Sequence, residues 1–503
     1  MTWPAVVVWI LILPGIFLSS PLYLLYLFFS LGAFGSLSVL PGESVVLVPQ
    51  ACCGVFLVSK NLLSKGQLSR AIDAAIDPGR LGLLFAFLFY ALFSAYVMPR
   101  LFAHMVEIIS MNSEVPWATP LDPTMSNIAQ SCYMTLSVGV ALVFALSSEN
   151  AYFRRHYLQA LLIGGLVLIA TGIADLMLSA AGLGALLEPF RNAYRLLVDN
   201  EVAGGTKRVV GLMPEASAYG STCLGAVANL VFLRPCFESA RLRNYIVPFT
   251  ILGLLAMVAL STSSAGYVGL AVFAVVYAAN WLRRAMSPDA PQREAIKSEA
   301  IFALSATLVF LAVLALTPHA LDSVFDLIDG MVFHKTESDS YAERTMWTRV
   351  AVDAFFTTNG FGVGLGSART SNWFANILSS TGIIGVALLG SFILRLFFRR
   401  CRAADPRTRE LASGLKFGML PRLATMALVG TTPDIGVDLA SSMVILTSLT
   451  STNALIIRFK DQGYQPCTSP EPPVGHMKSE ETRFQERGAL CIACSRATSP
   501  AWN

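Results

Sequence analysis

Long apolar stretches alternate with short polar segments along most of this chain. The stretches run for 16 to 25 residues, and about 20 residues of α-helix are needed to cross the hydrocarbon core of a bilayer. We therefore expect an all-α, polytopic integral membrane protein with twelve or thirteen transmembrane helices. The predicted spans lie near 4–19, 22–40, 44–59, 81–102, 129–147, 158–182, 218–235, 246–263, 265–282, 300–317, 374–398, 411–430 and 437–457.

The composition agrees with this pattern. Of the 503 residues, 54% are hydrophobic and 14% are charged, whereas soluble globular domains carry about 25% charged residues. A water-soluble enzyme is therefore excluded. The net charge of +4 does not indicate nucleic-acid binding, because the 36 Lys and Arg residues form no dense run.

The basic residues predict the orientation of the helices. Five linkers between predicted spans are rich in Lys and Arg, namely 60–80, 148–157, 236–245, 283–299 and 399–410. All five fall on one side of the membrane, which the positive-inside rule makes the cytoplasm. The longer loops 103–128, 183–217 and 319–372 fall on the other side. They contain no cysteine, so we expect no external disulfide. Residues 1–42 carry no charge, so Met1 is outside with thirteen helices and inside with twelve.

The composition changes after residue 460. Segment 461–503 is rich in Pro, Ser and Thr, which predicts a disordered cytoplasmic tail. Residues 1–460 then form the transmembrane domain, including the two large loops 183–217 and 319–372. Cys491 and Cys494 could join Cys467 and His476 in a zinc site, but a lone CxxC with irregular partners is a weak signal. We expect no metal and no cofactor.

Loop 183–217 offers the first candidate chemistry. Its segment 186–198 predicts an amphipathic helix lying at the membrane interface. Lys207 and Arg208 form an adjacent basic pair beside the bilayer, suited to a lipid-borne diphosphate and equally to ordinary headgroups. Glu215 follows a proline at a predicted helix start, where the helix dipole favours a carboxylate. The same carboxylate could instead accept a proton from a sugar hydroxyl.

Loop 319–372 contains the second group of candidate functional residues. Residues 340–353 predict a helix in which Ser340 and Glu343 form a capping box, and in which Arg349 and Asp353 pair across one turn. Arg344 has no such partner within the helix, and we favour it for ligand contact.

Glycine occupies positions 360, 362, 364 and 366 just beyond this helix. The segment lacks the endings and spacings of nucleotide-binding loops. Two interpretations stay open: the backbone amides approach an anionic ligand, or the glycines permit a tight re-entrant turn.

Arg422 lies deep within span 411–430 and is the one charge we expect far inside the membrane. It should face a partner or a watery cavity, so both a functional site and a buried ion pair would explain it.

Over roughly residues 80–400 the chain resembles the superfamily of O-antigen polymerases and O-antigen ligases. The matching pieces, in chain order, are Tyr96–Phe102, Pro214–Ser217, Ser261–Gly266, Arg344 with Trp347, Gly360–Ser367 followed by Ser371 and Asn372, and Gly382–Gly385.

This resemblance implies a C-type-like membrane glycosyltransferase of the bacterial inner (cytoplasmic) membrane. Such an enzyme takes oligosaccharide units from undecaprenyl diphosphate at the periplasmic face, in O-antigen, capsule or exopolysaccharide biosynthesis. Its partners would be the lipid-linked glycan and the bilayer. A chain-length regulator is a possible further partner, and no nucleic acid is expected. On this resemblance we expect Glu215 and Arg344 in catalysis. Substrate binding is expected from Lys207, Arg208, Trp347, Arg369, Asn372 and Arg422.

Two departures favour a polymerase over a ligase. The ligases usually have a His-Asn pair where this chain has Ser371-Asn372, and the Ser261–Ala265 turn lacks the arginine that often follows its serines. The alternatives are an O-antigen ligase proper and a transporter or flippase of lipid-linked glycans. A transporter would place its charges along a pore and often shows internal repeats, which we do not find in the sequence.

Overall fold

The computed structural model describes residues 1–461, apart from 19, 42–45, 112–116, 194–201, 204–205, 287–295, 297–298, 300–338 and 402–404. The predicted span 300–317 and the tail beyond residue 461 therefore lie outside the described residues, as do the zinc candidates Cys467, His476, Cys491 and Cys494.

The chain is mostly helical, and seven of its described helices are long and apolar enough to cross a membrane. These are α5 (Gly82–Leu101), α6 (Met125–Ser147), α7 (Ala151–Ala180), α8 (Ala216–Leu233), α9 (Val247–Leu260, preceded by the π-helical turn Leu242–Ile246), α10 (Ser264–Ala285) and α14 (Trp373–Phe398). All seven fall on predicted spans, which confirms a mostly helical protein with several helices that could span a membrane.

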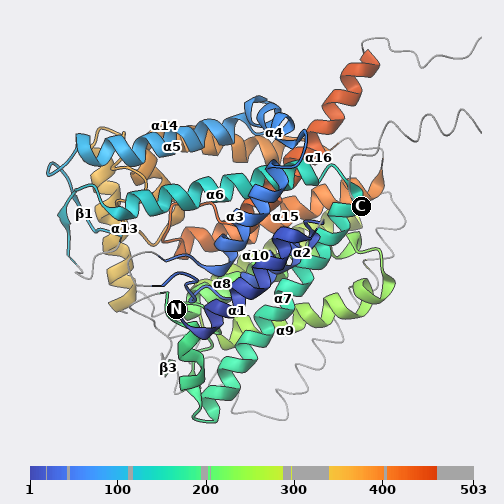
Figure 1. Ribbon diagram of the computed structural model, residues 1–503, viewed down its shortest axis with the longest axis horizontal. Helices are drawn as coiled ribbons and strands as arrows, with labels where there is room; N and C mark the ends of the chain where they lie inside the picture. The colour runs from blue at the N-terminus through green and yellow to red at the C-terminus, as the bar shows by residue number, and fades with distance from the viewer. Residues whose placement is uncertain are drawn as a thin grey trace, which may run out of the picture.

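Shorter or more polar helices fill the rest of the bundle in Figure 1. They are α1 (Trp3–Phe17), α2 (Leu22–Leu31), α3 (Pro49–Leu62), α15 (Pro406–Val429) and α16 (Val437–Asp461). The prediction of one helix over 22–40 is wrong beyond Leu31. The chain after Leu31 is non-helical because its backbone bonds elsewhere: the Ser36 amide donates to the Leu212 carbonyl at 3.0 Å. A further helix, α4 (Gln67–Ile76), lies within linker 60–80, where no element was predicted.

The five basic linkers meet at one end of the bundle, here called the basic end. Glu149 accepts from Arg70 and Arg80, which joins linkers 60–80 and 148–157. Glu238 pairs with Arg155 at 3.3 Å and with Arg407 at 3.5 Å. The remaining linker contributes Arg283, which donates to Ser413 near the start of α15 at 3.0 Å. These contacts place the described parts of the basic linkers at one end, and the side of the membrane that this end faces stays a prediction.

The opposite end, here called the loop end, carries the long connections. They contain two short hairpins, β1 (Glu107–Ile108) with β2 (Thr119–Pro120) and β3 (Val202–Ala203) with β4 (Thr206–Lys207), and the helix α13 (Asp339–Thr357). In Figure 1, β1, α13 and the N-terminus lie on the left and β3 at the lower left. The Trp3 ring packs edge-on against Phe190 at 5.1 Å, so Met1 lies at the loop end, a position that the sequence left open.

One local prediction in these loops is wrong at its start. Residues 186–190 of the predicted amphipathic α-helix 186–198 belong to a 3-10 helix, Gly184–Phe190, which contains Pro189 and ends before Arg191, and residues 194–198 lie outside the described residues. Proline lacks the amide hydrogen that an α-helix needs at that position. Helix α13 spans Asp339–Thr357, but the residues before it and the Ser340 side chain lie outside the description, so the capping box of Ser340 and Glu343 stays a prediction. The pair of Arg349 and Asp353 is confirmed at 4.0 Å.

Candidate functional site

An ion pair between two distant segments forms the centre of the site at the loop end. Arg344, from α13, donates through Nη2 to Oε2 of Glu215, at the start of α8, at 3.1 Å. The other carboxylate oxygen, Oε1, accepts from the hydroxyl of Ser217. The Arg344 and Glu215 side chains are 28% and 31% exposed, so the pair is reachable from water.

Arg208 lies close to this pair. Its Nε donates to the Ser261 carbonyl at 3.3 Å, and the amide of the next residue, Val209, donates to the Leu260 carbonyl at 3.1 Å. The segment after β4 is thereby fixed along the end of α9. The pKa of Arg208 is lowered overall, mainly by burial. The carboxylate of Glu215 acts in the opposite direction, and the charge of Arg344 lowers the pKa further. Arg208 is therefore within electrostatic range of both members of the pair.

Arg369 lies in the segment that connects α13 and α14. Its guanidinium lies over the Trp347 ring, 3.9 Å from the centroid, and Trp347 is buried. The pKa of Arg369 is lowered overall, mainly by burial. The carboxylates of Glu343 and Glu215 act in the opposite direction, and the charge of Arg344 lowers the pKa further. Among the described residues no carboxylate forms an ion pair with Arg369. We call Arg208, Glu215, Arg344 and Arg369 the arginine cluster.

The glycine-rich segment holds Arg369 in place. Its amides donate inside the protein: Val363 N to Ser379 O at 2.7 Å and Gly364 N to Ser380 O at 3.0 Å. A Cβ on Gly362, whose φ is +84°, would lie 2.6 Å from the Ser379 carbonyl oxygen. These contacts favour the tight re-entrant turn over the anion-binding interpretation. The turn ends where the Arg369 amide donates to the Ile109 carbonyl at 2.8 Å.

Lys207 lies next to Arg208 in sequence, but its ammonium points to a different group. Lys207 Nζ donates to Asp175 at 2.9 Å, and Arg191 donates to the same carboxylate at 3.0 Å. The other oxygen of Asp175 accepts the amides of Val210 and Gly211 at 2.9 and 3.1 Å. Asp175 is 1% exposed and anchors the segment that carries Arg208. The sequence contained a signal for it, because an acidic residue inside an apolar span usually has a specific role.

Asn372 is also occupied locally. Its side chain accepts from the Ala375 amide at 3.1 Å and caps the N-terminus of α14. The structure does not bring its amide into the arginine cluster.

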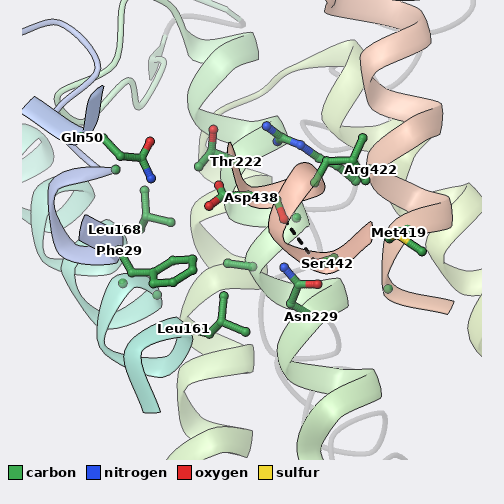
Figure 2. A pocket seen from close by; sticks show the side chains of 17 residues that line it. Phe29, Gln50, Leu161, Leu168, Thr222, Asn229, Met419, Arg422, Asp438 and Ser442 are labelled. Atoms are coloured by element: carbon green, nitrogen blue, oxygen red, sulfur yellow. Dashed lines mark hydrogen bonds between the residues drawn. The ribbon is translucent and has the colours of Figure 1, made fainter. Parts of the chain in front are cut away.

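Arg422 lies in a separate cavity of about 50 Å³ among α2, α3, α7, α8, α15 and α16. Figure 2 shows polar groups around it, with Asp438 between Arg422 and Asn229. The Arg422 Nη1 donates to the Ser221 carbonyl at 3.1 Å, while its Nε is buried without a hydrogen-bond partner among the described residues. The expectation that Arg422 would be the one deep charge is wrong, because Asp438 lines the same cavity.

Glycines make room for three of the polar side chains in this cavity. A Cβ on Gly32 would lie 3.0 Å from the Gln50 amide nitrogen, and one on Gly418 would lie 3.1 Å from the Asn229 amide oxygen. On Gly225 it would lie 3.4 Å from Cδ of Arg422. Gly32 directly after α2, Gly225 in α8 and Gly418 in α15 thus lack a side chain at places where a polar side chain packs. One water molecule needs about 10–15 Å³, so the cavity has room for a few.

Comparison of the chain with models of known protein families finds no family that matches, and comparison with curated protein sequences finds no match either. The chemistry of the arginine cluster must therefore be inferred from its geometry.

Proposed function

We propose that the protein is a membrane glycosyltransferase that joins oligosaccharide units carried on undecaprenyl diphosphate. The observation that carries this proposal is the arginine cluster. The Arg344 guanidinium contacts the Glu215 carboxylate at the loop end, partly open to water, and Arg208 and Arg369 from two other segments lie within electrostatic range of it. A diphosphate-linked donor already has its leaving group, so it requires cations to stabilise the developing charge and a group to accept a proton.

The residues divide between these two tasks. The acceptor sugar hydroxyl attacks C1 of the donor sugar, and the bond from C1 to the diphosphate oxygen breaks, with its electron pair leaving on the diphosphate. Arg344, Arg208 and Arg369 stabilise that charge, because guanidinium groups bind phosphate oxygens through paired N–H donors. Glu215 accepts the hydroxyl proton and later passes it to water. This division needs no nucleotide.

The distribution of charge supports an outward-facing site. The five basic linkers lie together at the basic end, and the positive-inside rule assigns such an end to the cytoplasm. The arginine cluster at the loop end would then face the periplasm, where lipid-linked glycans are available and nucleotides are scarce.

A polymerase fits these residues better than a ligase. Asn372, at the position of the asparagine in the ligase His-Asn pair, caps α14, and a serine precedes it. A histidine base at that point is absent from the sequence, which leaves Glu215 as the proton acceptor.

A second candidate function is a transporter or flippase of lipid-linked glycans. It is favoured by one observation, the cavity that holds Arg422 and Asp438, because charged residues within membrane helices often mark a transport path. A flippase would move the lipid-linked glycan between leaflets and leave its length unchanged.

Purified protein in liposomes with lipid-linked repeat units tests the two functions together. The glycosyltransferase is expected to lengthen the glycan. Arg344→Ala should reduce the rate roughly 10²- to 10³-fold, as loss of one charge-stabilising donor does. Asp353→Asn is the matched control, because it removes an exposed ion pair from the same helix and should leave the rate unchanged. Glycan that stays unextended would refute the enzyme, and movement between leaflets without extension would support the flippase.

A further inference from the structure

Both carboxylate oxygens of Glu215 are engaged in the structure, one by Arg344 and the other by Ser217. A base must have an oxygen within hydrogen-bond reach of the proton it accepts. We propose that Glu215 occupies the position on Arg344 that a diphosphate oxygen takes, so that donor binding displaces the carboxylate and releases it to accept the proton. This inference rests on the proposed function and adds an order of events to it.

The backbone leaves Glu215 free to change partners. Glu215 is the N-cap residue of α8, yet its side chain makes no capping hydrogen bond to the helix amides. Two side chains, and no backbone group, hold the carboxylate in the described structure. Carboxylate and phosphate oxygens present the same kind of acceptor to a guanidinium, so an exchange on Arg344 keeps its hydrogen bond.

The guanidinium groups of the arginine cluster should bind a diphosphate more strongly than they bind the carboxylate of Glu215. A diphosphate carries more negative charge than one carboxylate and has several oxygens. The Trp347 ring contacts the face of the Arg369 guanidinium, which leaves its N–H edges for an anion. The Arg344–Glu215 pair, in contrast, is partly exposed, and ion pairs of that kind are weak. The incoming anion is therefore the stronger ligand of Arg344.

Simple charge repulsion must be separated from this exchange. Removing any nearby carboxylate would strengthen binding of an anion, so Glu215→Gln alone decides nothing. Glu215→Asp retains the charge but shortens the side chain by one methylene, which withdraws it from Arg344. Glu343→Gln is the control for charge repulsion alone. It removes a carboxylate that also acts on Arg369 but forms no ion pair with Arg344. Exchange predicts a gain in affinity for Glu215→Asp, whereas repulsion predicts none.

The experiment is titration calorimetry of the full chain in detergent with farnesyl diphosphate as the probe. Exchange predicts that Glu215→Asp and Glu215→Gln lower the Kd roughly 1.4- to 5-fold, the worth of a partly exposed ion pair. In an Arg344→Gln background Glu215→Asp should have no effect. Gel filtration of each variant confirms that it is folded before titration.

The outcomes separate the two proposals. Binding by the wild type with an unchanged or higher Kd for Glu215→Asp would overturn the exchange and leave the proposed function standing. A gain for Glu215→Asp that persists without Arg344 would overturn the exchange in the same way. A folded wild-type protein that does not bind farnesyl diphosphate would overturn the donor site, and the exchange with it.

Discussion

Asp175→Asn tests whether a buried carboxylate outside the arginine cluster holds the segment that carries Arg208. The wild-type carboxylate compensates two cations, Arg191 and Lys207, and accepts two backbone amides. The variant keeps the volume and one acceptor oxygen but loses the charge. Arg191, whose side chain is 5% exposed, then loses its ion pair with this carboxylate in a poorly solvated position.

The expected loss follows from this burial. Removing one partner of a buried ion pair costs about 3–5 kcal/mol, and Asp175 pairs with two cations and accepts two amides. Asp353→Asn breaks a pair whose side chains are 83% and 70% exposed, and exposed pairs are worth about 0.2–1 kcal/mol. Asp175→Asn should therefore lower the free energy of unfolding at least threefold more than Asp353→Asn.

Unfolding in mixed micelles of increasing SDS content measures both variants under one condition. Lys207→Met gives a further check, because loss of the ammonium should cost stability in the wild type and little in the Asp175→Asn background. A loss below about 1 kcal/mol for Asp175→Asn would show that the Asp175 charge is not needed to hold this segment, and the anchoring argument would fail.

Three further predictions concern the glycine turn, the cavity and the topology. Gly362→Ala should destabilise the protein by about 1–3 kcal/mol through backbone strain, measured by the same unfolding assay. Gly390→Ala in α14, where a Cβ meets nothing within 4 Å, should be neutral or stabilising. Arg422→Gln and Asp438→Asn should show a coupling of about 0.5–3 kcal/mol in a double-mutant cycle, and additive losses would contradict a shared cavity. In a cysteine-free background, an impermeant maleimide added outside cells should label Asp353→Cys and spare Arg407→Cys, and the reverse would invert the topology.

The sequence predicted the membrane helices well because lipid imposes a strict condition on them. Every backbone amide inside a bilayer must be bonded within its own segment, so a long apolar stretch has few alternatives to a helix. The condition is weaker at the ends of the spans. The chain after Leu31 bonds to Leu212, a partner far away in sequence that no local pattern could indicate.

The sequence indicated Arg344 and Glu215 as candidates but not that they pair, and it did not indicate that Lys207, Asn372 and Arg422 lie elsewhere. Arg344 stood out because its own helix offered it no partner. That the partner is Glu215, 129 residues earlier, depends on how the loops fold back at the loop end. Lys207 and Arg208 looked equivalent in sequence, but successive side chains of an extended segment point to opposite sides. Lys207 therefore binds Asp175, and Arg208 turns toward the arginine cluster.

Burial separates the residues that hold the site from those that could use it. Asp175 and the turn at Gly362 are almost fully enclosed, and an enclosed ion pair or backbone contact cannot change partners without a large loss. Arg344 and Glu215 are about one-third open to water, so their pair can be exchanged at little cost. A residue that binds and releases substrate in every cycle needs the second property. The two groups should therefore respond differently to substitution: the enclosed residues lose stability and activity together, whereas Arg344 and Glu215 lose activity while the protein stays folded.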